Sequence, residues 1–168
     1  MNIAIRKAKI DDIKMLAYIQ TESWKAAFAE IISADDMERC TDISKAETMY
    51  ENVLKSGYAE ISILEIDGKP HCIAAWSKAR NPEFSDSAEL ICIHSLRDNW
   101  GKGYGTLMIN HVFNEIKISG YNSVLLWVFE KNTHARNFYE KHGFVLTDNT
   151  QISYDAAEVM YRKELCRI

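Results

Sequence analysis

The sequence predicts a single α/β (α+β) domain: a mixed sheet of about six to seven strands with antiparallel N-terminal strands, a central parallel unit and helices on both faces. The chain's 168 residues suit one domain with a substantial core. Asp67-Gly68 joins two β-rich runs, which predicts a tight antiparallel hairpin. Strand-like, helix-like and strand-like segments follow one another over residues 88–129, which predicts a right-handed parallel crossover. The predicted domain spans residues 1–168.

The N-terminal half is predicted to begin with a strand and two helical regions. Residues 2–8 alternate apolar and polar, as a half-buried strand does. Asp11 or Asp12 caps a helix whose apolar stripe reaches toward Trp24. A second helical region covers about residues 34–54, before the hairpin.

The C-terminal half is predicted to continue the alternation of strands and helices. Its segments are a strand over 88–94, a glycine-rich turn, a helix over about 103–119, a continuously apolar strand over 123–129, a helix over about 132–142 and two closing strands within 144–149 and 158–165. Gly143 occupies the place of a C-terminal helix cap.

Composition excludes several classes of function. The net charge of −4 gives no long-range attraction to nucleic acid or to anionic membranes. The longest apolar run, 124–129, is far shorter than the roughly 20 residues of a membrane helix, and the N-terminus lacks a signal-peptide core. We therefore expect a cytoplasmic protein with no nucleic-acid or membrane partner.

Cysteine and histidine spacing predicts no metal site. The cysteines, at positions 40, 72, 92 and 166, form no C-x-x-C pair, and we interpret them as buried thiols. His111 and Glu115 share a helical face but lack a third ligand, so we interpret them as surface residues.

The stretch "NWGKGYGTLM" places Gly101, Gly103 and Gly105 where a helix begins. Such a turn bares backbone N–H groups and adds the positive end of a helix dipole, which favours a bound phosphate. Tight turns with positive φ are the alternative explanation for one or two of these glycines. The spacing matches neither the Walker A loop nor the dinucleotide fingerprint G-x-G-x-x-G.

Two motifs resemble the GNAT superfamily of N-acetyltransferases. "AELICIHSLRDNWGKGYGTLMINHVF" resembles its acetyl-CoA-binding motif, [QR]-x-x-G-x-[GA], and "VLLWVFEKNTHARNFYEKHGF" resembles its N-x-x-A-x-x-[FL]-Y-x-x-x-G-F motif. The S-W-x-x-x-F pattern at 23–28 resembles uncharacterised bacterial members. The resemblance implies a GNAT-like domain with acceptor-side helices over about 9–55 and an acetyl-CoA-binding core over 88–144. It also implies acetyl-CoA or coenzyme A as cofactor and acetyl transfer to a primary amine by direct attack in a ternary complex.

The resemblance also assigns the cofactor-binding residues. These are Ile93, His94, Ser95, Trp100, Gly101, Lys102, Gly103, Tyr104, Gly105, Thr106, Asn132, Ala135, Arg136 and Tyr139. Trp100 departs from the family pattern, because it stands where the family carries Gln or Arg. Arg97 replaces a usual proline and either reaches a phosphate or is solvated. Asn132 is a helix N-cap, a contact to the pantetheine arm, or both.

Acetyl transfer to an amine needs a proton acceptor and a proton for the departing thiolate. Glu89 is the leading candidate base, since burial beside Leu90 and Ile91 favours a raised pKa; a structural glutamate that faces solvent or pairs with a basic side chain is the alternative. His94 is the alternative base. Tyr139 takes the family's general-acid position, with core packing as the alternative role.

The acceptor site is predicted to include Trp24 and Phe28. With Glu30, Asp35 and Asp36 they could line an aromatic and acidic mouth for a cationic amine; a helix with core aromatics and solvated acids is the alternative. The acceptor itself and the oligomeric state are not readable from the sequence, although dimers occur among relatives. A non-catalytic acyl-CoA sensor or interaction module is the alternative function, which Glu89 and Tyr139 together disfavour.

Overall fold

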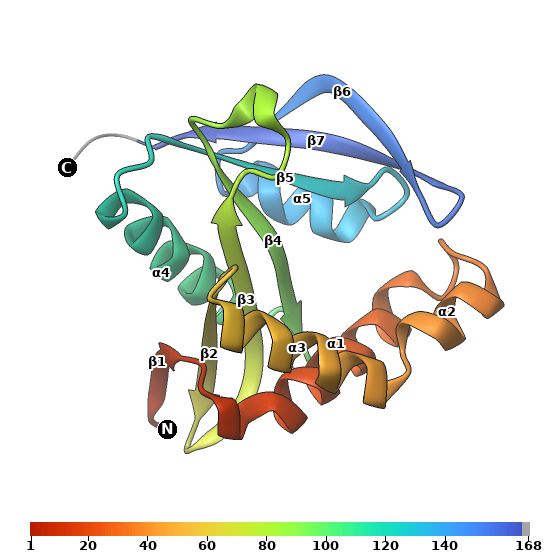
Figure 1. Cartoon of the computed structure of the whole chain (residues 1–168), viewed down its shortest axis with the longest axis vertical. Coiled ribbons are helices and arrows are strands. Elements are labelled where there is room, and N and C mark those ends of the chain that lie inside the picture. The colour runs from red at the N-terminus through yellow and green to blue at the C-terminus, as the bar shows by residue number, and fades with distance from the viewer. Residues whose placement is uncertain (166–168) are drawn as a thin grey trace.

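The computed structural model describes residues 1–165 as a seven-stranded mixed sheet with helices on both faces, which confirms the predicted fold class (Figure 1). The strands are β1 (Ile3–Lys7), β2 (Glu60–Ile66), β3 (Lys69–Lys78), β4 (Ala88–Ser95), β5 (Ser123–Phe129), β6 (Val145–Ser153) and β7 (Ala156–Glu164). The α-helices are α1 (Ile13–Phe28), α2 (Ala34–Cys40), α3 (Ile43–Ser56), α4 (Tyr104–Ile118) and α5 (Thr133–Lys141). Short 3₁₀ turns lie at Ile10–Asp12, Pro82–Phe84 and Arg97–Asn99.

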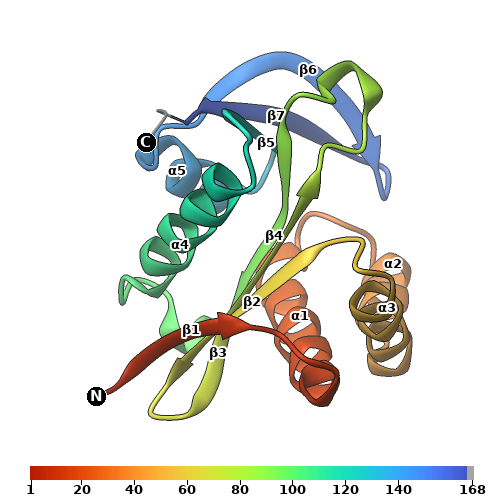
Figure 2. The ribbon, with the colours of Figure 1, turned by 60° about the vertical axis from the view of Figure 1, so that its left-hand side comes forward.

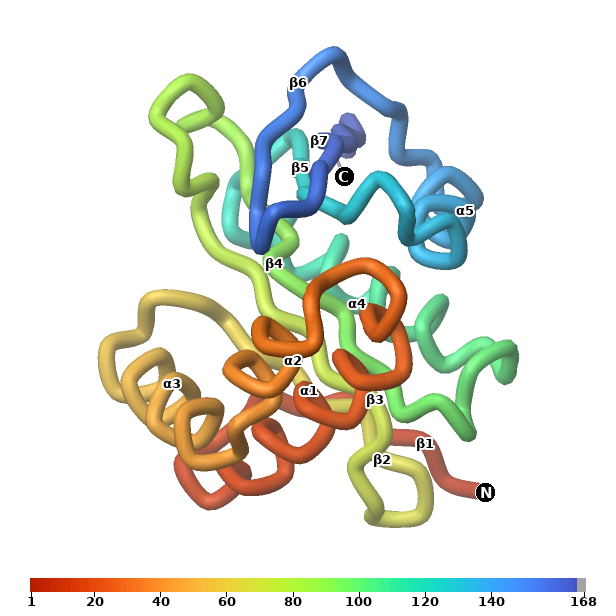
Figure 3. The backbone as a smooth tube through the Cα atoms, turned by 90° about the vertical axis from the view of Figure 1, so that its right-hand side faces the viewer, coloured from red at the N-terminus to blue at the C-terminus, as the bar shows by residue number. Residues whose placement is uncertain are grey.

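The sheet order is β1-β2-β3-β4-β5-β7-β6, and only the β4–β5 pair is parallel. Helices α4 and α5 lie on one face, whereas α1, α2 and α3 lie on the other (Figure 2). Figure 3 shows β4 passing between the half of the molecule with β1–β3 and the half with β5–β7. The predicted antiparallel N-terminal strands and central parallel unit are therefore confirmed.

Each face of the sheet carries its own apolar core. On one face, α4 buries residues at helical spacing, among them Met108, Val112 and Ile116, against β-strand residues that include Leu90 and Leu126. On the other face, α1 and α3 pack on β2 and β3 through a second cluster: Leu16, Ala17, Ile19, Ala46, Tyr50, Ile61, Ile63 and Ile73. These two layers hold β4 between α4 and α1.

Three local details correct or complete the sequence predictions. The helical region predicted over 34–54 is two helices, because the Asp42 side chain accepts hydrogen bonds from Ser44 N and Lys45 N and so starts α3. Helix α4 begins one residue later than predicted, since Gly103 has φ +86°. The Asp67-Gly68 turn has φ +49° and +76°, as the predicted hairpin requires.

The prediction of buried thiols is confirmed for Cys72, whereas Cys40 and Cys92 are partly buried. Cys166 lies outside the described residues. None of the helices in residues 1–165 is both long and apolar enough to cross a membrane.

Candidate active site

The centre of the candidate site is the parting of β4 from β5. The two strands pair only through Ala88–Val124 and Glu89–Leu125, although β4 continues along β3 as far as Ser95. A bulge lies just beyond the last β4–β5 pair, because Trp76 opposes Leu90 and Ala75 opposes Cys92, which leaves Ile91 unpaired. Bulges bend the strand that carries them. Beyond Glu89, the edge of β4 is therefore free to meet an extended ligand, and residues 93–95, which are predicted to bind the cofactor, lie on this edge.

The glycine turn lies between the end of β4 and α4. Gly101 and Gly103 have φ +75° and +86°, and a Cβ at either position would meet nothing within 4 Å. Within residues 1–165, no backbone acceptor bonds the N–H groups of 101–106, and the first hydrogen bond of α4 runs from Leu107 N to Gly103 O. Free donors, open space and a helix N-terminus suit a diphosphate, so the chain's own residues fit the expected cofactor.

Gly105 has a different role from Gly101 and Gly103. A Cβ on Gly105 would lie 3.2 Å from Phe138 Cε2, so this glycine allows α4 and α5 to pack closely. The hydroxyl of Thr106 also faces α5, where it lies 3.1 Å from His142 Nε2. Gly105 thus also serves the packing of α4 on α5, while its backbone N–H stays among the free donors of 101–106. The Thr106 hydroxyl is engaged by His142, which leaves its backbone N–H for a ligand.

Three more predicted cofactor residues have side chains engaged with protein. Lys102 Nζ donates to Asn99 Oδ1 at 3.3 Å. The Tyr104 side chain is buried in the core, which leaves its backbone N–H for a ligand. Arg136 donates to Tyr161 OH and Glu130 O, both at 3.0 Å, and so is directed toward β7 rather than toward the glycine turn. These bonds connect α5 to β7 and to the residue after β5, and the cofactor contact of Arg136 stays a prediction.

Trp100 begins the glycine turn. Its Nε1 donates to Ser95 O at 2.9 Å, and its ring stacks on that of His134, with centroids 4.8 Å apart and planes at 18°. The indole N–H is thus already used by protein. Arg97 is exposed in the preceding 3₁₀ turn.

Asn132 caps α5, because its Oδ1 accepts from Ala135 N at 3.2 Å. The cap leaves the Asn132 amide nitrogen, a donor, available to a ligand. The sequence left open whether this residue is a cap, a ligand contact or both, and the structure confirms the cap.

Tyr139 lies on α5 and is only 9% exposed. Its ring packs edge-on against Phe138 and Phe144, so the core-packing role is observed. No other described residue hydrogen-bonds its hydroxyl. Burial raises the pKa of this phenol above its usual value. Tyr139 is therefore protonated at neutral pH and able to donate.

Glu89 is 2% exposed and pairs with Arg80, a partner that the sequence did not reveal. Arg80 donates to Oε1 from Nε at 3.0 Å and from a terminal guanidinium nitrogen, and its backbone N donates to Oε2 at 3.0 Å. The same contacts raise the pKa of Arg80. The alternative of a glutamate paired with a basic side chain is thus observed, and these three hydrogen bonds fix the position of the carboxylate.

His94, the alternative base, pairs with Ile73 of β3 near the end of β4. Burial lowers the pKa of its imidazole to about 4. His94 is therefore neutral at physiological pH and a weak proton acceptor.

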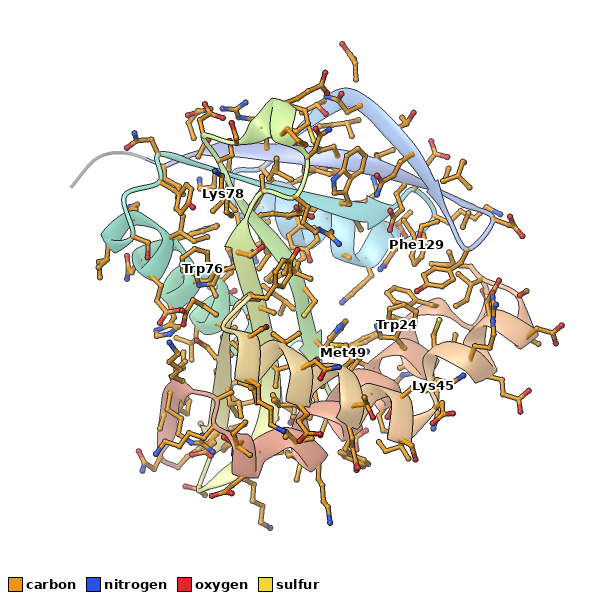
Figure 4. The ribbon with its side chains drawn as sticks, in the orientation of Figure 1. Trp24, Lys45, Met49, Trp76, Lys78 and Phe129 are labelled. Atoms are coloured by element: carbon orange, nitrogen blue, oxygen red, sulfur yellow. The ribbon has the colours of Figure 1, made fainter. Side chains whose placement is uncertain are left out.

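The two predicted acceptor residues belong to an aromatic cluster at the end of α1. Trp24 and Phe28 meet edge-on at 5.0 Å, Phe28 meets Phe129 at 5.1 Å, and Trp24 meets Tyr154 at 5.7 Å. Figure 4 shows Trp24 and Phe129 near one another between α1 and the end of β5. The Trp24 Nε1 is buried without a partner among the described residues. Phe129 and Tyr154 escaped sequence reasoning because they are distant in the chain.

The predicted acidic mouth is only partly present. Asp36 is buried and bonds to Ser33 and Arg39, so its carboxylate is engaged. Glu30 and Asp35 are exposed. Among residues 1–165 no three metal-ligating side chains gather to hold an ion.

Comparison with known proteins identifies the family. A model described as the Acetyltransferase (GNAT) family matches residues 21–144. The uncharacterized N-acetyltransferase YuaI of Bacillus subtilis is 24% identical over 153 residues, 90% of this chain and 86% of that protein. The spermidine N(1)-acetyltransferase of Thermoplasma acidophilum is 26% identical over 150 residues, 88% of this chain and 91% of that protein.

The fold agrees with that of solved acetyltransferases. The PaiA N-acetyltransferase of Thermoplasma acidophilum, in complex with coenzyme A, superposes with a TM-score of 0.83 at 21% identity, over 98% of this chain and 99% of that chain. The yncA acetyltransferase of Salmonella typhimurium with its cofactor acetyl-CoA gives 0.74 at 17% identity, over 98% and 94%. The family match covers the glycine turn and α5, where both motifs lie. The chain therefore belongs to the Acetyltransferase (GNAT) family and is an acetyl-CoA-dependent acetyltransferase.

Proposed function

We propose that this chain acetylates a primary amine by direct attack of the amine on acetyl-CoA, with both substrates bound together. The observation that carries the proposal is the parting of β4 from β5. Beside the edge of β4 that β5 leaves unpaired lie the free N–H donors of 101–106 and helix α5, which carries Tyr139. Bound there, acetyl-CoA supplies a thioester whose carbonyl carbon the amine attacks as its C–S bond breaks.

Tyr139 is the proposed general acid. Its phenol is protonated, held by ring packing, and bonded to no other described residue, so it can donate to the departing thiolate. Asn132 supports the pantetheine arm through its amide nitrogen while its oxygen caps α5. The N–H groups of 101–106 hold the diphosphate.

Glu89 is the proposed general base, acting through a water molecule. It is buried and held by Arg80, so a proton would reach it by relay rather than by direct contact with the amine. His94 is the less suitable base, because a pKa of about 4 lies far below the value near 10.4 of an alkylamine. Arg80 acts as the residue that positions the Glu89 carboxylate.

For the acceptor, we propose a small cationic amine that enters beside the aromatic cluster of Trp24, Phe28, Phe129 and Tyr154. Aromatic faces attract ammonium groups, and the exposed Glu30 and Asp35 lie on the segment that follows α1. The similarity of this chain to a spermidine N(1)-acetyltransferase supports polyamines as members of this acceptor class. Peptide amines are the competing class. The buried Trp24 N–H would favour them, since a peptide carbonyl can accept from it and the protonated nitrogens of a polyamine cannot.

The test is release of free thiol from acetyl-CoA in the presence of spermidine, other small amines and short peptides. We expect turnover with at least one amine, and a loss of about 100-fold in kcat for Glu89→Gln, since general bases contribute 10²–10⁴-fold. Glu65→Gln is the matched control, because Glu65 also pairs with an arginine, Arg6, but lies on β2. Coenzyme A binding without turnover on any amine would favour the sensor instead.

The dimer and the cytoplasmic location stay predictions. Light scattering on the purified chain would give its mass in solution, and cell fractionation would give its location.

A further inference from the structure

Trp100 connects the two sides of the β4–β5 parting. Its indole N–H donates to Ser95 O, at the last residue of β4, and its ring stacks on His134, in the first turn of α5 directly after β5. Strands β4 and β5 run parallel and do not pair with each other beyond Glu89 and Leu125. Their carboxyl ends therefore lie on the two sides of the parting. The two contacts of Trp100 therefore reach from one flank to the other.

The stack differs from the other contacts between α4, its preceding turn and α5. Deeper in the molecule, Gly105 packs against Phe138, and Thr106 bonds to His142. At the stack, His134 is exposed and no described residue hydrogen-bonds its imidazole. The stack with Trp100 lies at the surface, so this connection can open without disturbing the packed helices.

The stack also lies on the path to the glycine turn. Trp100 directly precedes the free N–H donors of 101–106, so a diphosphate bound by them lies next to the indole. The pantetheine arm must run from there into the parting. An arm that takes this path passes the Trp100–His134 pair.

We propose that Trp100 and His134 form a clasp that closes over coenzyme A where its diphosphate joins the pantetheine arm, making His134 a further cofactor-binding residue. This inference rests on the cofactor position given under the proposed function. At this position Trp100 acts through its ring and not as a side-chain donor to phosphate, because its N–H is used by Ser95. Cofactor release requires the stack to open.

The test is the dissociation rate of labelled coenzyme A from the full chain, chased with excess acetyl-CoA. Trp100→Ala removes both contacts and His134→Ala removes the stack, and we expect each to raise the rate about tenfold, the effect of losing one aromatic pair. His134→Phe keeps a flat ring and should stay within about twofold of the wild type. His111→Ala, in the middle of α4 where the imidazole contacts Ser62 of β2, is the matched histidine control.

Unchanged dissociation in both alanine variants would overturn the clasp. So would a His134→Phe variant that behaves as His134→Ala does, because it would show that the imidazole contacts phosphate and does not act through stacking. A wild-type chain that binds no coenzyme A would overturn the proposed cofactor site together with the clasp, whereas normal binding with unaltered rates would overturn the clasp alone. Thermal melts of the same variants separate loss of the clasp from loss of fold.

Discussion

On the glycine-turn side of the β4–β5 parting, the proposed binding groups are backbone N–H donors, whereas on the α1 side they are side chains from several elements. The donors belong to one short stretch, 101–106. The aromatic cluster draws on α1, β5 and the β6–β7 turn, and the Glu89–Arg80 pair joins β4 to the loop after β3. A backbone site needs a particular local conformation, while a side-chain site needs the whole fold. Mutations should therefore act differently on the two sides.

The largest effect should come from Gly103→Val on the backbone side. A valine at φ +86° is strained and fills the open space before the donors, so loss of two charge-assisted hydrogen bonds should weaken coenzyme A binding more than about 1,000-fold. Calorimetry measures the affinity. Gly120→Val is the matched control, with φ +92° and equally open space but a position between α4 and β5. A folded Gly103→Val chain that binds coenzyme A as tightly as the wild type does would contradict the proposal that the N–H donors of 101–106 bind the diphosphate.

The pH dependence of the free energy of unfolding should show the burial of His94, on the other side of the parting. The folded pKa of about 4 lies below the unfolded value of 6.5, so the unfolded chain takes up the proton first as pH falls. His94 thus favours folding above pH 6.5 and loses that contribution between pH 6.5 and 4, by about 3 kcal/mol. Urea unfolding of wild type and His94→Leu across this range gives the difference. Parallel curves would contradict the buried imidazole.

Loss of the Tyr139 hydroxyl should lower the turnover number more than it lowers the affinity for coenzyme A. Tyr139→Phe keeps the packing against Phe138 and Phe144 but removes the proton donor, so we expect kcat to fall about 100-fold with little change in coenzyme A affinity. Steady-state kinetics and calorimetry on the same preparation separate the two quantities. An unchanged kcat would reduce Tyr139 to a packing residue.

The smallest effect should come from Phe28→Leu in the aromatic cluster. Loss of the edge-on contacts with Trp24 and Phe129 should raise the acceptor KM about tenfold and leave coenzyme A affinity unaltered, which is the reverse of Gly103→Val. Phe113→Leu, at a buried position of α4, controls for loss of a buried ring. A weaker coenzyme A affinity in Phe28→Leu would mean that the two sides are not independent.

Sequence reasoning predicted local backbone geometry well and contacts between elements poorly. The positive φ of Gly101 and Gly103 and the Asn132 cap are local features, which neighbouring residues largely decide. It did not reveal that Gly105 packs against Phe138 or that Arg136 bonds to Tyr161, because these partners come from other elements. It missed Arg80 as the partner of Glu89, because nothing in the spacing of nine residues indicates that the bend after β3 returns the guanidinium to β4.

The order of strands and helices, the hairpin turn and the position of the glycine turn were predictable from the residues alone, since periodicity, caps and positive-φ glycines act within a few residues. Three features needed the folded chain: the point where β4 leaves β5, the meeting of α1 aromatics with Phe129 and Tyr154, and the stack of Trp100 on His134. These contacts join residues far apart in the chain. Their geometry depends on how the sheet bends at the Ile91 bulge and how the helices pack on it.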